Sequence, residues 1–234
     1  HTLGQLLVWL DKHPDVKANT DVFVTSDHGF ATISRREIDR TANATSAESA
    51  QHVYDRASGK IATNKSYLPS GFLAIDLAWA LQTNLWDPDD PAPVGSRSPY
   101  KQVRLAMDDT FKPLERWERP RHGNGLLGQS VFKVDGSDAT AIVVANGGSD
   151  LIYVPDKNAE TVQHIVKTLP KLDYVGGIFV DDRYGKLPGS LPLSAIDLVG
   201  SAVTPRPDIV VAFKTFYLNP GDLMQGIQIS DGGL

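Results

Sequence analysis

The chain has 234 residues, of which 41% are hydrophobic and 22% charged, with a formal net charge of −5 and no cysteine. This is the composition of an ordinary globular domain, and its negative charge argues against a nucleic-acid-binding surface. No apolar run approaches the roughly 20 residues of a membrane span. Without cysteine, any zinc site must use histidine and carboxylate ligands.

The chain opens with an apolar helical pattern. Leu3, Leu6, Leu7 and Leu10 follow the i, i+3, i+4, i+7 spacing of one buried helix face, and Pro14 ends the pattern. Because such a helix must pack on a neighbour at once, the pattern favours a chain that begins inside a fold. The glycine-rich end, residues 231–234, is consistent either with a fold that continues or with a disordered tail.

A short apolar, β-prone run follows at residues 21–25 and predicts a buried parallel strand. Ser26-Asp27-His28-Gly29 stands at the carboxyl end of this strand, where open α/β sheets bind ligands. A carboxylate and an imidazole suit Zn²⁺, and Gly29 allows the backbone to turn behind them. We therefore expect Asp27 and His28 to converge on one metal ion. The alternative is a solvated loop in which Asp27 caps a turn.

Later segments repeat the alternation of strands and helices. Residues 71–77 predict a strand that runs into a helix over 77–85, and Val162, Ile165, Val166 and Leu169 predict a helix that Pro170 ends. Further strands are predicted at residues 141–145, 151–154, 175–180 and 209–213. We therefore predict an α/β fold with a mostly parallel sheet flanked by helices, and an irregular insertion over residues 30–135.

Residues 20–30, with the Ser26-Asp27-His28-Gly29-Phe30 string, resemble a signature of the alkaline phosphatase superfamily, in its type I phosphodiesterase/nucleotide pyrophosphatase branch. The preceding Leu3-Gly4-Gln5-Leu6-Leu7 helix is similar to one in that branch. Residues 70–77 and 145–153 also resemble segments of bacterial members. The resemblance implies an alkaline phosphatase-like single domain over residues 1–234, incomplete at both ends.

The resemblance also implies a mechanism for the intact enzyme. Two zinc ions flank a Thr or Ser nucleophile that attacks a phosphate ester, and Asp27 and His28 match the ligand pair of the ion beside that nucleophile. The nucleophile and the other ligands are expected upstream of residue 1. No catalytic residue is therefore assigned in this chain, which should be inactive without the missing N-terminal part of the same protein. The substrate-binding residues are not identified.

Other polar groups are weaker candidates for a site. His122 is a possible late metal ligand but fits a loop histidine better, and Gly147-Gly148 fits a turn better than a phosphate cradle. The acidic clusters at residues 87–90 and 181–182 are interpreted as exposed turns. Alternative functions are a non-catalytic α/β binding module, or a sulfatase or phosphoglycerate mutase-like member of the superfamily. The resemblance favours a periplasmic or secreted protein.

Overall fold

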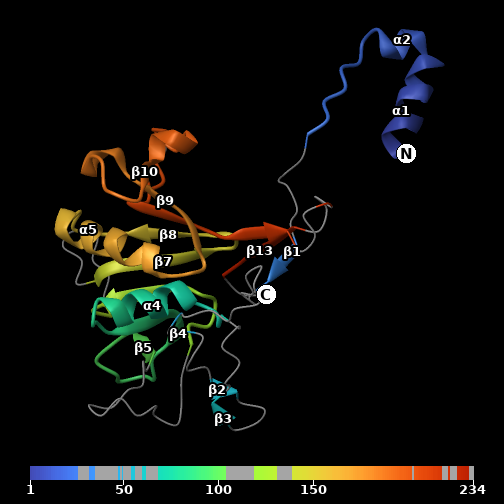
Figure 1. Cartoon of the computed structure of the whole chain (residues 1–234). Helices are drawn as coiled ribbons and strands as arrows, with labels where there is room; N and C mark the ends of the chain where they lie inside the picture. The colour runs from blue at the N-terminus through green and yellow to red at the C-terminus, as the bar shows by residue number, and fades with distance from the viewer. Residues whose placement is uncertain are drawn as a thin grey trace. The chain divides into compact units, whose positions relative to one another are not determined.

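The computed structural model of the protein describes residues 1–25, 32–34, 47, 49, 54–55, 60–61, 68–103, 119–130, 139–201, 203–217, 221 and 226–231. The chain divides into two units, His1–Phe30 and Ala31–Leu234, which are described separately (Figure 1). A single domain over residues 1–234, incomplete at both ends and with an insertion over 30–135, stays a prediction.

The first unit contains the helices α1 (Thr2–Asp11) and α2 (Pro14–Lys17). The predicted opening helix is confirmed, but its leucine face is only partly buried. Leu10 is buried, at 5% exposed, whereas Leu6 is 47% exposed. Residues 21–25 form no strand, and Phe23 is 89% exposed. The predicted buried strand is therefore wrong in this structure, because a β-prone segment becomes a strand only where a second strand pairs with its backbone.

The second unit is built on an eight-stranded sheet with the order β10-β9-β11-β8-β7-β6-β4-β5 (Figure 1). Every neighbouring pair is antiparallel except β10 and β9. The strands are β4 (Leu85–Pro91), β5 (Tyr100–Val103), β6 (Gly125–Gly128), β7 (Ala139–Asn146), β8 (Ser149–Tyr153), β9 (Val175–Val180), β10 (Leu191–Pro192) and β11 (Ile209–Phe213).

The expected mostly parallel, alkaline phosphatase-like sheet is therefore wrong: the sheet is mixed and mostly antiparallel, with few helices in the described residues. One reason is the Gly147-Gly148 turn between β7 and β8, where Asn146 pairs with Ser149. Two residues can connect only antiparallel strands, and Gly147 supplies the positive φ, 72°, that such a turn needs.

A second reason is the position of β11. The helix α5 (Ala159–Thr168) connects β8 to β9, and these two strands run in the same direction. However, β11 lies between them and is antiparallel to both. A strand from a distant part of the chain has thus converted a parallel pair into two antiparallel pairs.

Two smaller sheets complete the second unit. In the first, β13 (Gly226–Ile229) pairs in parallel with β1 (Thr32–Ser34) and antiparallel with β12 (Thr215–Tyr217). The other consists of β2 (Tyr54–Asp55) and β3 (Lys60–Ile61). Short 3-10 helices occur at Leu169–Lys171, Asp182–Tyr184 and Leu193–Ile196.

The helix α4 (Phe72–Ala80) and α5 contact each other, and their buried residues join the core beside the main sheet (Figure 1). In α5, the predicted helix is confirmed: Val162, Ile165 and Val166 are buried, and Asn158 caps its first turn. Residues 71–77, by contrast, form most of α4 rather than the predicted strand. Because α4 is buried from Phe72 to Ala78 and is apolar apart from Asp76 over that range, it has no amphipathic period to separate it from a buried strand.

Close packing fixes α4 against the sheet. A side chain at Gly125 of β6 would place its Cβ 2.7 Å from Ala74 Cβ and 2.7 Å from Leu85 Cδ1. Phe72, Tyr174 and Phe213 form an aromatic cluster, with the ring centroids of Phe72 and Tyr174 4.6 Å apart. The core therefore lies between α4, α5 and the strands β6, β8 and β11.

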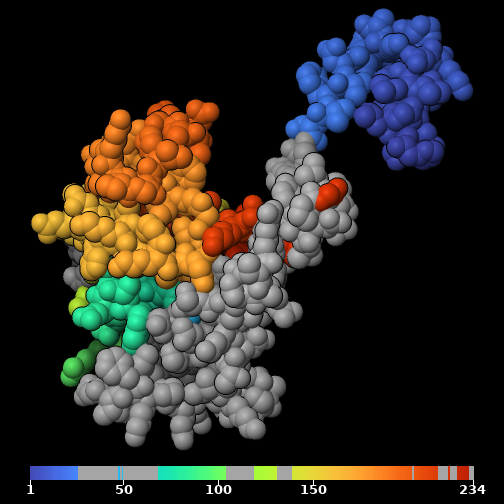
Figure 2. All heavy atoms as spheres, viewed as in Figure 1, coloured from blue at the N-terminus to red at the C-terminus, as the bar shows by residue number. Residues whose placement is uncertain are grey.

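The outer surface of the second unit carries exposed apolar side chains in a segment that begins with β10. Figure 2 shows residues 191–200 in orange on the outside of this unit. Leu191 is 56% exposed and Val199 is 48% exposed. In the part of the chain that the structure describes, no helix is both long and apolar enough to cross a membrane.

Candidate functional site

The predicted metal ligands Asp27 and His28 lie outside the described residues, so their convergence on one ion stays a prediction. The residues on either side of them are described. Before the pair, residues 21–25 are exposed and do not form a strand. After the pair, β1 begins at Thr32 and pairs with β13, so that Ile33 lies opposite Gln228. The chain beyond His28 is thus attached to a strand nearly 200 residues later in the sequence.

The strand β13 is itself tied to the β7–β8 turn. Asp231 and Gly147 form an antiparallel bridge in which the Asp231 N–H donates to the Gly147 carbonyl oxygen at 2.8 Å. Gln228 Nε2 donates to the Gly148 carbonyl oxygen at 3.2 Å. Gly147-Gly148 therefore forms a turn, as interpreted from the sequence. Its two carbonyl oxygens accept hydrogen bonds from Gln228 of β13 and from Asp231 just beyond it.

A second metal site does not emerge from the described residues: none of them form a group of three or more histidines and carboxylates suited to an ion. His122 is exposed in a bend. His13 is half-buried, stacks on Trp9 at a ring separation of 4.2 Å, and places Nδ1 2.8 Å from the Trp9 carbonyl oxygen. A ligand role for His122 stays a prediction, because the predicted pair itself lies outside the described residues.

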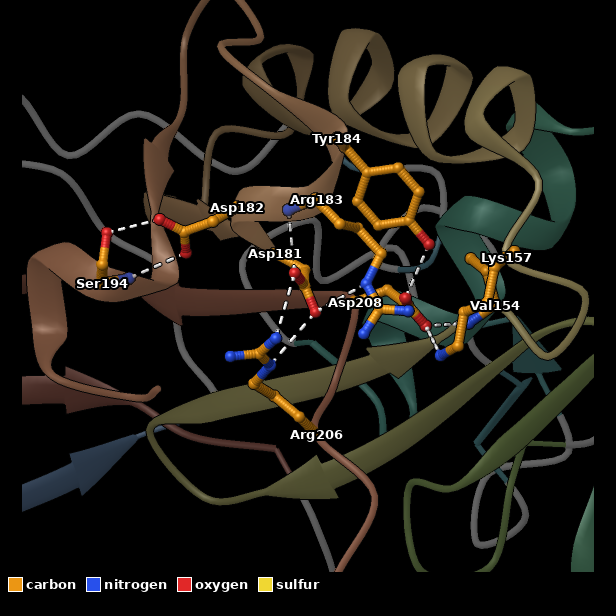
Figure 3. A network of polar contacts seen from close by, with 9 residues as sticks. All are labelled: Val154, Lys157, Asp181, Asp182, Arg183, Tyr184, Ser194, Arg206 and Asp208. Atoms are coloured by element: carbon orange, nitrogen blue, oxygen red, sulfur yellow. Dashed lines mark hydrogen bonds and ion pairs between the residues drawn. The ribbon is translucent and has the colours of Figure 1, made fainter. Parts of the chain in front are cut away.

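The densest polar network lies where β8 and β9 end and β11 begins (Figure 3). Asp208, completely buried, accepts hydrogen bonds from the Val154 N–H at 2.8 Å, Lys157 Nζ at 2.7 Å and the Tyr184 hydroxyl at 2.7 Å. Burial, the hydrogen bond to Asp208 and the charge of Asp208 together raise the pKa of the Tyr184 hydroxyl. Three donors thus compensate the buried charge of one carboxylate.

Asp181 and Asp182 belong to the same network. Asp181 is completely buried and accepts from the Arg183 N–H at 3.0 Å and from Arg206 Nε at 3.1 Å. Burial alone would raise the pKa of Asp181, but the Arg183 hydrogen bonds and the charges of Arg183 and Arg206 outweigh it and lower that pKa. Asp182 accepts from the Ser194 hydroxyl at 2.6 Å. The predicted exposed turn is therefore wrong for Asp181, which is a buried ion-pair partner.

The acidic cluster in β4 is satisfied in a similar way. Asp87, 3% exposed, accepts from the Arg121 N–H at 2.7 Å, and Asp90 forms an ion pair with Arg121 at 3.0 Å. Asp89 accepts from Asn124 Nδ2 at 2.7 Å. Burial raises the pKa of Asp87 despite its backbone hydrogen bonds. The exposed turn predicted at residues 87–90 is therefore wrong, because these residues belong to β4. Their carboxylates bind Arg121 and Asn124.

Sequence reasoning missed the buried carboxylates of the second unit. Asp76 accepts from the Ser49 N–H at 2.7 Å and from the Tyr174 hydroxyl at 2.9 Å. Asp150 in β8 and Asp231 beyond β13 lie together in the interior. The sequence did offer one signal for Asp76, which is a single aspartate within an otherwise apolar run. A charge at such a position is rarely buried without partners, so the run indicates that Asp76 has hydrogen-bond donors elsewhere in the fold.

Comparison with known families supports the resemblance. The family model described as type I phosphodiesterase/nucleotide pyrophosphatase matches residues 1–80, which include Asp27 and His28. Comparisons with curated proteins and with solved structures give no significant match. The match covers 80 of the 234 residues, about a third of the chain, and shows similarity to type I phosphodiesterases/nucleotide pyrophosphatases over that range.

Proposed function

We propose that this chain is part of a metal-dependent hydrolase of phosphate mono- or diesters, similar to nucleotide pyrophosphatases and phosphodiesterases. The observation that supports the proposal is the family match over residues 1–80, with Asp27 and His28 inside the matched range. The residue types also suit the chemistry, since Zn²⁺ accepts carboxylate oxygen and imidazole nitrogen as ligands.

In this proposal Asp27 and His28 hold one of two zinc ions. A bound zinc ion would neutralise phosphate charge and lower the pKa of a hydroxyl nucleophile. Two protein ligands leave at least two positions of a tetrahedral zinc ion to water, so binding to this chain alone should be weak. The Thr or Ser nucleophile and the remaining ligands would come from an N-terminal part of the same protein, and export to the periplasm or beyond is part of the proposal.

Two measurements test the proposal. The isolated chain with added Zn²⁺ should hydrolyse bis(p-nitrophenyl) phosphate no faster than buffer, whereas a longer polypeptide with an upstream Thr or Ser nucleophile should hydrolyse it. In that longer polypeptide, His28→Ala should abolish turnover and His164→Ala, at an exposed position of α5, should not. Turnover that survives His28→Ala would exclude the metal role.

A substrate panel addresses the choice of ester. A sulfatase-like enzyme would prefer a sulfate ester under the same conditions, and a phosphoglycerate mutase-like enzyme would transfer phosphate between sugar-acid hydroxyls. A non-catalytic binding module would show no turnover in any polypeptide that contains residues 1–80.

A further inference from the structure

Two carboxyl groups share a hydrogen bond inside the second unit. Asp150, in β8, is completely buried, and Asp231, directly beyond β13, is 3% exposed. Asp150 Oδ2 is buried and accepts from no N–H or hydroxyl donor among the described residues, and its carboxyl group lies close enough to that of Asp231 for the two to form a hydrogen bond. Because an ionised carboxylate offers only acceptor oxygens, this bond requires that one of the two acids carry a proton.

The pair joins three parts of the fold. Asp231 Oδ1 accepts from the Gly71 N–H at 2.8 Å, and the Asp231 N–H donates to the Gly147 carbonyl oxygen at 2.8 Å. Asp150 Oδ1 accepts from the Asn146 N–H at 3.3 Å. The end of β13 is thereby fastened to the β7–β8 hairpin and to the residue that precedes α4.

The surroundings decide which acid keeps the proton. Asp231 accepts the Gly71 N–H at the start of α4, where backbone amides and the helix dipole favour a negative charge. Asp150 Oδ1, in contrast, accepts the Asn146 N–H at the longer distance of 3.3 Å, compared with 2.8 Å for the bond that Asp231 accepts from Gly71. These hydrogen bonds favour the proton on Asp150, which would then donate to ionised Asp231.

Electrostatics point the same way. Burial, then the negative charge of Asp231, then the shared hydrogen bond raise the pKa of Asp150 well above its usual range, and the Asn146 N–H opposes them only in part. In the part of the chain that the structure describes, Asp76 and Tyr174 are titratable groups beside the pair, since Tyr174 experiences the charges of Asp76, Asp150 and Asp231 together. Both are acids, so neither supplies a positive charge to the pair.

We propose that Asp150 and Asp231 form a proton-dependent latch that fastens β13 to the main sheet. Loss of the proton would leave two like charges in contact in the interior, and like charges in one site repel. Since β13 also pairs with β1, the latch controls the strand that begins shortly after His28. The proposal needs only described residues and does not depend on the proposed hydrolase activity.

The direction of the pH dependence follows from linkage. The folded chain binds the Asp150 proton more tightly than the unfolded chain does, so the latch contributes its full stability below the unfolded pKa of about 4. That contribution is lost as the pH rises through the raised folded-state pKa of Asp150.

Hydrogen exchange of the Ile229 and Asp231 amides tests the latch, with EDTA present so that no metal replaces the proton. After correction for intrinsic exchange, their protection in the wild-type chain should fall with rising pH by up to about tenfold per pH unit, the limit for one proton. In Asp150→Asn the neutral amide donates to Asp231 at every pH, so protection should stay high. Asp197→Asn, at an exposed position, should behave as wild type.

Two outcomes would overturn the latch: wild-type protection that does not change with pH, or the same pH dependence in Asp150→Asn. If Asp150→Asn does not fold, infrared spectra of the wild-type chain decide. The C=O stretch of a buried protonated acid should disappear over the same pH interval in which Ile229 and Asp231 lose protection. A chain with no such band at any pH in the series would contradict the proposal.

Discussion

The hydroxyl of Tyr174 donates to Asp76 Oδ2 at 2.9 Å across 98 residues of sequence. Asp76 also accepts from both the N–H and the hydroxyl of Ser49, at 2.7 and 2.8 Å. The three donors stabilise a carboxylate that α4 carries into an apolar core. This small network therefore connects α4 with Ser49 and with Tyr174, which directly precedes β9.

Removing the Tyr174 hydroxyl should destabilise the fold. In Tyr174→Phe the ring remains, but the buried Asp76 carboxylate loses one donor, which costs about 1–3 kcal/mol. Tyr100→Phe, at a half-buried position of β5, is the matched control and should change little. Urea unfolding measures both variants, and equal midpoints for Tyr174→Phe and wild type would contradict the interpretation.

Alkaline solution should destabilise the chain through Tyr184. Burial and the bond to Asp208 raise the pKa of the Tyr184 hydroxyl, so the folded state holds this proton more tightly than the unfolded state. The contribution is complete below the unfolded value of about 10 and is lost as the pH rises through the folded value. Unfolding free energies measured above pH 9 should fall less steeply in Tyr184→Phe. A slope identical to wild type would show that Tyr184 does not contribute.

Acid should act through Asp181 in the opposite sense. Hydrogen bonds and charges from Arg183 and Arg206 lower the pKa of Asp181 despite its burial. This contribution is present above the unfolded value of about 4 and is lost as the pH falls through the folded value. Arg206→Gln should therefore move the midpoint of acid unfolding to higher pH. Lys171→Gln, at an exposed position, should leave the midpoint in place.

Truncation of Asp208 should be more damaging than its neutralisation. Asp208→Ala leaves the Val154 N–H and the Tyr184 hydroxyl without their acceptor, at a cost of about 1–3 kcal/mol for each buried donor. Asp208→Asn keeps one acceptor oxygen and should lose less. Thermal unfolding ranks the two variants, and an alanine variant as stable as the asparagine variant would contradict the assigned bonds.

The exposed apolar segment at residues 21–25 should promote self-association. Phe23 is 89% exposed and Val24 is 72% exposed, and exposed β-prone apolar segments tend to pair with other chains. Phe23→Ser with Val24→Ser should reduce concentration-dependent association in sedimentation velocity. Val203→Ser, which replaces a fully exposed valine in the second unit, should not. If association is unchanged in the double variant, the self-association involves a surface other than residues 21–25.

Some features follow from the sequence alone. The helix spacing of Val162, Ile165 and Val166 predicted α5, and runs of β-branched residues predicted β7, β8, β9 and β11. The Asp27-His28 string led to the family that matches residues 1–80. These features are local, because hydrophobic period and short motifs depend on residues close together in the chain.

Only the tertiary structure decided the strand directions and the partners of the buried acids. Whether β8 and β9 neighbour each other depends on β11, which comes from later in the chain and separates them. The pairing of Asp150 with Asp231 likewise joins segments with no common local pattern. Strand partners and the partners of buried charges come from segments that are distant in the sequence and meet only in the fold. A short stretch of sequence therefore does not predict either kind of pairing.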